Sequence, residues 1–137
     1  GFVANYNFKK GIEDWFKKKE VQNVSRVLDS RDLFLIGDLW GRREKNSLIV
    51  KYEELLRKGQ APDEILRTVL WHVKNICMAA VGKTREMKPF VANKALQQAR
   101  NFNGDSLEQA FTTLVGLDNK YKKETLETGL LHFFLTQ

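Results

Sequence analysis

Apolar residues recur along most of the chain at the three- and four-residue spacing of a helix face. The longest such stretch, residues 63–81, follows Pro62, which is favoured in the first helical turn. Its apolar stripe is wide enough that both sides are expected to touch neighbouring helices, so we expect this helix to be the most buried. One row holds Ile65, Val69, Val73, Ile76 and Ala80, and the row beside it holds Leu66, Leu70 and Cys77.

The same spacing predicts helices on either side of this one. Residues 44–58 form an amphipathic pattern that ends before Gly59, a typical helix stop. A further helix is predicted from Pro89, and Asn103-Gly104 ends it. The apolar sides contain Leu48, Tyr52, Leu55 and Leu56 in the first, and Phe90, Val91, Ala95 and Phe102 in the second.

Two helices are predicted towards the end of the chain. Asp105 and Glu108 resemble a capping box, in which side chains bond free backbone N–H groups at a helix start. The last helix is predicted despite Gly129, because burial of its neighbours offsets the cost of a helical glycine, about 1 kcal/mol. The apolar positions are Leu107, Phe111, Leu114, Asp118 and Tyr121, then Leu126, Leu130, Leu131, Phe133 and Phe134.

The pattern as a whole predicts an all-α fold. The segments "GIEDWFKKKE" and "DLFLIGDLWG" are typical of two shorter helices near the front of the chain. No segment combines sustained alternation with a hairpin turn, so we expect a bundle of about six or seven helices. We assign residues 33–137 to one helical domain and residues 1–32 to a helical N-terminal extension whose place is open.

Composition fits a single globular domain, with 137 residues, 42% hydrophobic and 29% charged. The single cysteine, Cys77, cannot pair within the chain, which favours a cytoplasmic protein. No apolar run is long enough for a membrane span, and no signal peptide is visible. The chain begins with Gly1 rather than Met, which fits a fragment of a longer protein.

The tripeptide Gly82-Lys83-Thr84 matches the tail of a phosphate-binding loop, but the first glycine of that motif is replaced by Cys77. The tripeptide also follows a helix rather than a strand, so we interpret Gly82 as a helix stop before a basic linker. No His/Cys cluster has metal-ligand spacing, and His72 and His132 lie among apolar residues without a nucleophile motif. We expect no cofactor, no metal, no small-molecule substrate and no catalytic site.

The net charge of +6 is spread over segments that mix both signs. The densest basic patch contains Lys83, Arg85, Lys88 and Lys94. A solvated loop is the favoured interpretation, and contact with a phosphate backbone or an acidic subunit is the alternative. Trp40, Arg42 and Arg43 form a candidate partner interface, with helix-end packing of Trp40 equally open.

Several segments together resemble the C-terminal domain of the delta subunit of the bacterial DNA polymerase III clamp loader. The segment "LFLIGDLWGRR" is similar to a Phe-x-Leu-x-Asp motif through Phe34, Ile36 and Asp38. The segment "KPFVANKALQQARNF" carries a Gln98-Ala99-Arg100 pattern, and "ETLETGLLHFFL" resembles a closing Leu-Glu-x-x-Leu-Leu motif. The resemblance covers about residues 33–135 and spans many helices rather than one sharp motif.

The resemblance implies a collar domain, in which helical bundles of five subunits pack into a ring. It implies other clamp-loader subunits as partners in a hetero-oligomer, proximity to DNA, no membrane contact and no ATPase activity of the chain itself. The alternative function is a helical DNA-binding module that uses the basic linker.

Overall fold

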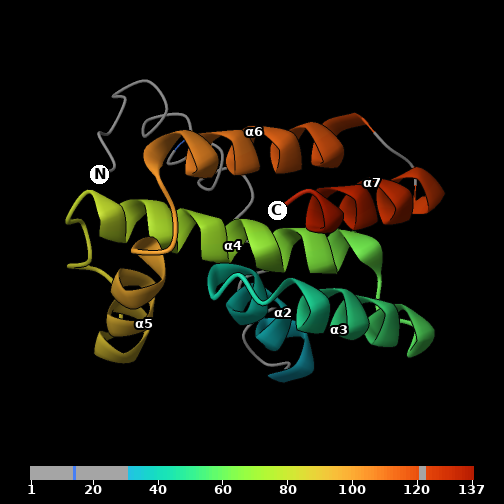
Figure 1. Cartoon of the computed structure of the whole chain (residues 1–137), viewed down its shortest axis with the longest axis horizontal. Coiled ribbons are helices and arrows are strands. Elements are labelled where there is room, and N and C mark those ends of the chain that lie inside the picture. Colours follow the sequence, from blue (N-terminus) through green and yellow to red (C-terminus); the bar gives the residue numbers. More distant parts are fainter. Residues whose placement is uncertain (1–13, 15–30, 121–122) are drawn as a thin grey trace.

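A computed structural model of the chain describes Asp14 and residues 31–120 and 123–137. These residues form six helices and no strand, which confirms the all-α prediction for the described part (Figure 1). The predicted helix "GIEDWFKKKE", apart from Asp14, and Tyr121 lie outside it. The helices are α2 (Arg31–Gly41), α3 (Lys45–Arg57), α4 (Pro62–Ala80), α5 (Pro89–Ala99), α6 (Gly104–Lys120) and α7 (Lys123–Leu135).

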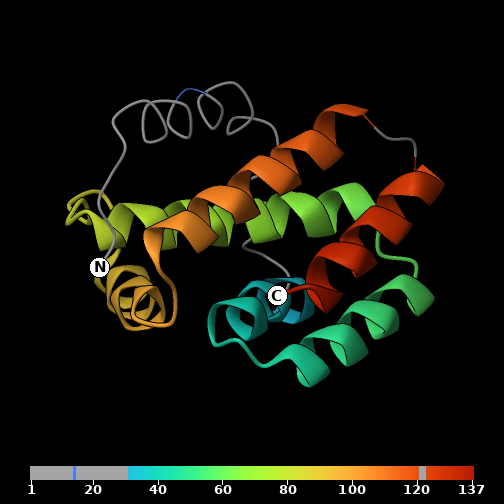
Figure 2. The same cartoon turned by 45° about the horizontal axis from the view of Figure 1, so that its top comes forward.

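The longest described helix, α4, lies at the centre of the bundle. It packs against α2, α5, α6 and α7, while α3 packs against α2 and α7 (Figures 1 and 2). Both of its predicted apolar rows are buried apart from the half-buried Ala80, which confirms its two-sided packing. In both views α5 lies at the end of the molecule where α4 ends, away from α3 and α7.

Backbone hydrogen bonds close the end of α4 in the way the sequence predicts. Gly82 has φ of 79°, its N–H donates to the Ala79 carbonyl, and the Lys83 N–H donates to the Met78 carbonyl. This pair of bonds is the Schellman motif, which places a left-handed residue just after a helix. The tripeptide at residues 82–84 is therefore part of a helix stop and loop, and it does not open a helix.

Two local predictions are wrong. The predicted capping box at Asp105 is replaced by Asn103, whose side-chain Oδ1 accepts the Ser106 N–H at 2.8 Å at the start of α6. Phe102 does not extend the apolar side of α5, because that helix ends at Ala99. Phe102 instead stacks on the Trp40 ring, with 4.6 Å between ring centroids.

Replacing Gly82 by Ala is expected to lower the free energy of unfolding by about 1 kcal/mol, because alanine strains a left-handed position. Gly116 is the control: it lies inside α6, and an added Cβ would meet nothing within 4 Å. Gly116→Ala should therefore stabilise the chain by up to about 1 kcal/mol. Urea unfolding followed by circular dichroism measures both changes, and shifts of the same sign would contradict this assignment.

Candidate functional site

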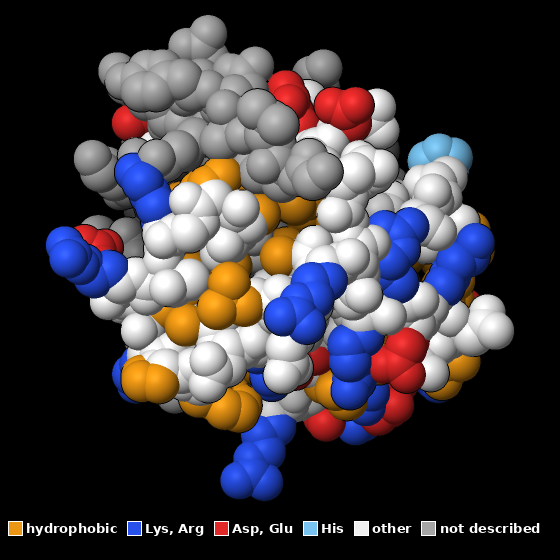
Figure 3. All heavy atoms as spheres, turned by 60° about the vertical axis from the view of Figure 1, so that its left-hand side comes forward, with side chains coloured by type: hydrophobic (Ala, Val, Ile, Leu, Met, Phe, Trp, Pro, Cys, Tyr) orange, Lys and Arg blue, Asp and Glu red, His pale blue; other side chains and the backbone are white. Residues whose placement is uncertain are grey.

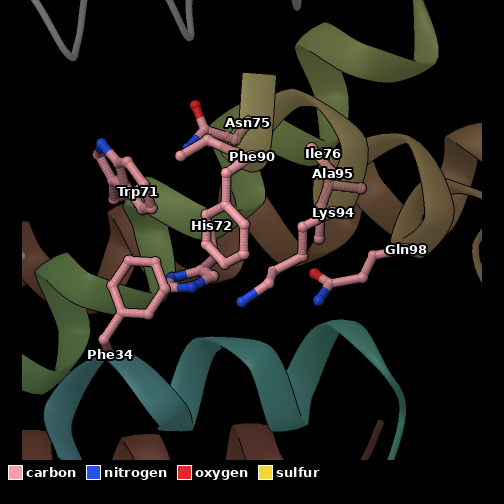
Figure 4. Close-up of a pocket in the computed structure, with 10 residues that line it drawn as sticks. Phe34, Trp71, His72, Asn75, Ile76, Phe90, Lys94, Ala95 and Gln98 are labelled. Carbon is pink, nitrogen blue, oxygen red and sulfur yellow. The ribbon is translucent and has the colours of Figure 1, made fainter. Parts of the chain in front are cut away.

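The carboxylate of Asp38 on α2 is the meeting point of three helices. The Lys94 ammonium on α5 lies 2.8 Å from Asp38 Oδ2, and the Gln98 amide nitrogen lies 3.4 Å from Oδ1. The His72 Nε2 on α4 lies 3.5 Å from Oδ1, which is ion-pair distance without a formed hydrogen bond. Figure 4 shows the Lys94 and Gln98 side chains extending from α5 into the space above α2, where the His72 ring lies.

Two glycines allow α2 to approach its neighbours this closely. A Cβ on Gly37 would lie 2.0 Å from His72 Nδ1, and a Cβ on Gly41 would lie 2.0 Å from Gln98 Oε1. Real Cβ atoms do not approach other atoms at such distances, so His72 and Gln98 occupy the space that larger residues on α2 would fill. The Asn101 amide donates to the Gly41 carbonyl at 2.9 Å and ties the end of α5 to the same helix.

Asp38 is held in its charged form. Burial by itself would raise the pKa of Asp38, but hydrogen bonds and charge attraction from His72 and Lys94 outweigh it and lower the pKa to about 2. On the far side of the ring, His72 Nδ1 lies 2.9 Å from the Thr68 carbonyl oxygen, which can only accept, so Nδ1 is the donor. His72 is thus fixed by its own helix and turned towards α2.

Aromatic side chains border a small surface cavity above this cluster. The Lys94 Nζ lies 4.6 Å from the Phe90 ring centroid and 5.6 Å from the Phe34 centroid, and Phe34 contacts Trp71 at 5.4 Å between centroids. The cavity has a volume of about 20 Å³, and Asn75 contributes to its lining (Figure 4). Phe90 is 68% exposed, so the predicted apolar side of α5 is only partly buried.

The predicted basic patch is divided by the fold. Lys83, Arg85 and Lys88 are exposed on the α4–α5 loop, whereas Lys94 turns inward to Asp38. Figure 3, which brings forward the side of the molecule that carries α5, shows Lys and Arg side chains around exposed hydrophobic ones. A basic surface therefore remains, but it has three of the four predicted cations.

The candidate interface residues Trp40, Arg42 and Arg43 have different surroundings. Trp40 is 1% exposed and stacks on Phe102, which favours helix-end packing over a surface role for its ring. Arg42 is exposed and pairs with Glu44 at 2.8 Å. Arg43 is exposed with φ of 59°, and its guanidinium lies 4.8 Å from the Phe102 ring centroid. The two arginines stay candidate rim residues.

Groups that could carry covalent or metal chemistry are not assembled in the part of the chain that the structure describes. Burial raises the pKa of the Cys77 thiol to about 12, so this thiol is a poor nucleophile. His132 is exposed on α7, far in sequence from His72. Among the described residues, no group of three or more His, Cys, Asp or Glu side chains could hold a metal ion.

The Asp38 cluster was not predicted as a site, although its parts were visible in the sequence. Asp38 and Gln98 were two of the residues that carried the resemblance, and Lys94 lies one helical turn before Gln98. Such i, i+4 polar pairs on an otherwise apolar face are a signal for a buried partner. The identity of that partner depends on how α2 and α5 are placed on α4, which no local pattern contains.

The helices and this polar crossing define a helical packing domain. A comparison with protein-family models matches residues 30–137 to the family described as DNA polymerase III delta subunit, C-terminal domain. The chain belongs to this family, which confirms the resemblance found in the sequence. Searches of curated proteins and of solved structures found no match. None of the described helices is long and apolar enough to cross a membrane.

Replacing Asp38 by Asn is expected to lower the free energy of unfolding by about 2 kcal/mol near pH 7, the size of hydrogen bonds to a charged group. Because the pKa of Asp38 falls from 3.8 to about 2 on folding, the wild-type advantage is complete above 3.8 and is lost as the pH falls towards 2. Urea unfolding at several pH values measures this convergence.

The control is Asp32→Asn on the same helix, since Asp32 forms an exposed ion pair with Lys58 at 3.2 Å. Exposed pairs contribute little, so this variant should lose less than about 1 kcal/mol. A loss in Asp38→Asn no larger than in Asp32→Asn would show that the crossing does not depend on the buried carboxylate.

Proposed function

We propose that this chain is the collar domain of a clamp-loader subunit. It packs against helical domains of other loader subunits in the cytoplasm and so holds together the assembly that loads sliding clamps in DNA replication. The observation that carries this proposal is the family match over residues 30–137.

The distribution of apolar side chains supports a packing role. The buried core is continuous from α2 to α7, yet some large apolar side chains remain in solvent. Scattered exposed residues are common on monomers, but helical domains that assemble need such side chains on their outer faces. These residues are Val50 on α3, Phe90 and Leu96 on α5, and Leu135 on α7.

The proposal assigns the chain no reaction of its own, as an accessory subunit of the polymerase holoenzyme. The Cys77 thiol is buried, and the Asp38 carboxylate is occupied by Lys94 and Gln98. These contacts stabilise the bundle and leave no free nucleophile or base at the crossing. The partners are therefore proteins, in a hetero-oligomer, and not small-molecule substrates.

The second candidate function, direct DNA binding, is favoured only by the exposed loop cations Lys83, Arg85 and Lys88. With Lys94 turned inward, three phosphate contacts are available instead of four. The slope of log K against log salt would then be at most about −2.7, from −0.9 per contact. Packing of helical domains should be far less sensitive to salt.

Mixing the chain with other clamp-loader subunits at micromolar concentration should yield a larger complex, because their helical domains would bury the exposed apolar side chains. Size-exclusion chromatography with light scattering measures the mass, and the complex should persist at high salt. The control is the same mixture without this chain. Failure to co-elute, together with tight DNA binding that falls with salt at the slope above, would favour the DNA-binding alternative.

A further inference from the structure

A cleft with both apolar and charged borders lies where α5 meets α2 and α4. We call it the α5 cleft: Phe34, Trp71, Phe90 and Lys94 border its cavity, and Asn75 contributes to its lining. A cavity of about 20 Å³ accepts a group about the size of a water molecule. The α5 cleft therefore suits the tip of one protein side chain and is too small for a nucleotide or another cofactor.

The lining of the α5 cleft contains an unpartnered donor. The Asn75 side chain is 7% exposed, and its Nδ2 has no hydrogen-bond partner among the described residues. A buried donor without a partner is unfavourable, and native structures seldom leave one. The neighbouring Lys94 ammonium is a second donor at the same cavity. A group that enters here is best matched if it brings an acceptor oxygen.

The surface next to the α5 cleft is strongly basic. The stretch from residue 83 to residue 100 has five Lys or Arg residues and one acidic residue, Glu86. Of the five, Lys94 is bound to Asp38, while the three loop cations are exposed. Charge complementarity therefore selects a partner with several carboxylates. The basic residues are Lys83, Arg85, Lys88, Lys94 and Arg100.

We infer that the α5 cleft and the loop beside it bind an acidic segment of a neighbouring clamp-loader subunit. An apolar side chain of that segment packs on Phe90, a carboxylate or amide oxygen at its tip accepts from Asn75, and flanking carboxylates face Lys83, Arg85 and Lys88. This inference rests on the proposed function and adds the surface and the partner's chemistry.

A protein segment fits the α5 cleft better than single-stranded nucleic acid does. Nucleic-acid platforms need open aromatic faces on which successive bases stack. One face of Phe90 is covered by the Lys94 ammonium at 4.6 Å, and Trp71 is half-buried against Phe34 and His72. The remaining aromatic surface accommodates one apolar side chain rather than a row of bases.

The test compares Phe90→Ala with Val50→Ala in the full 137-residue chain. Both residues are exposed, at 68% and 62%, so neither substitution should unfold the bundle, and α3 lies away from α5 (Figure 2). Binding to the other loader subunits is measured by titration calorimetry. Phe90→Ala is expected to raise Kd about tenfold, as loss of an interface anchor does, whereas Val50→Ala changes Kd less than about twofold.

A second variant tests the charge requirement without touching the bundle core. Arg85→Glu combined with Lys88→Glu should raise Kd by a further factor of about ten at low salt, and this difference should shrink as salt is added. Circular dichroism of every variant checks that the fold is kept.

The outcomes separate this inference from the proposed function. Subunit binding by the wild type, with equal Kd for Phe90→Ala and Val50→Ala, would overturn the α5 cleft as the contact and leave the proposed function intact. Absence of subunit binding by the wild type would overturn both. Tight binding of a dT oligonucleotide that Phe90→Ala abolishes, with subunit binding unchanged, would assign the cleft to single-stranded DNA and overturn the inference.

Discussion

The close crossing of α2 over α4 at Gly37 is the constraint on which the rest of the structure depends. Without a side chain on Gly37, the His72 ring fits directly against the α2 backbone, and the next residue, Asp38, reaches the same space. Because Gly41 repeats this arrangement towards Gln98, one face of α2 receives both α4 and α5. The position of α5 on the bundle thus follows from two missing Cβ atoms and one carboxylate.

A polar tie of this kind serves orientation more than stability. Ion pairs that are partly withdrawn from water lose much of their attraction to desolvation, so Asp38 and Lys94 contribute less than an apolar contact of equal size. Their geometry is nevertheless specific, because a carboxylate with two oxygens binds Lys94 and Gln98 from one helix at once. We expect this tie to fix α5 and to hold Lys94 between Phe34 and Phe90, where the α5 cleft forms.

The sequence predicted helices well and their mutual placement poorly. The centre of the bundle could be predicted because the two apolar rows of α4 exceed what one neighbour can cover. The exposure of Phe90 and the burial of Gln98 could not, since both reverse the usual preference of their residue types. They are explained only by Asp38, which lies 60 residues before Gln98 in the chain and directly opposite it in the fold.

Membership of the delta-subunit family gives this architecture a role in which an outer helix matters more than an active site. Hydrogen exchange of the chain, alone and mixed with the other clamp-loader subunits, tests that role most directly. The account predicts slower amide exchange in residues 83–100 when the partners are present, with little change in the buried core of α4. Unchanged exchange throughout the chain in the presence of all partners would contradict it.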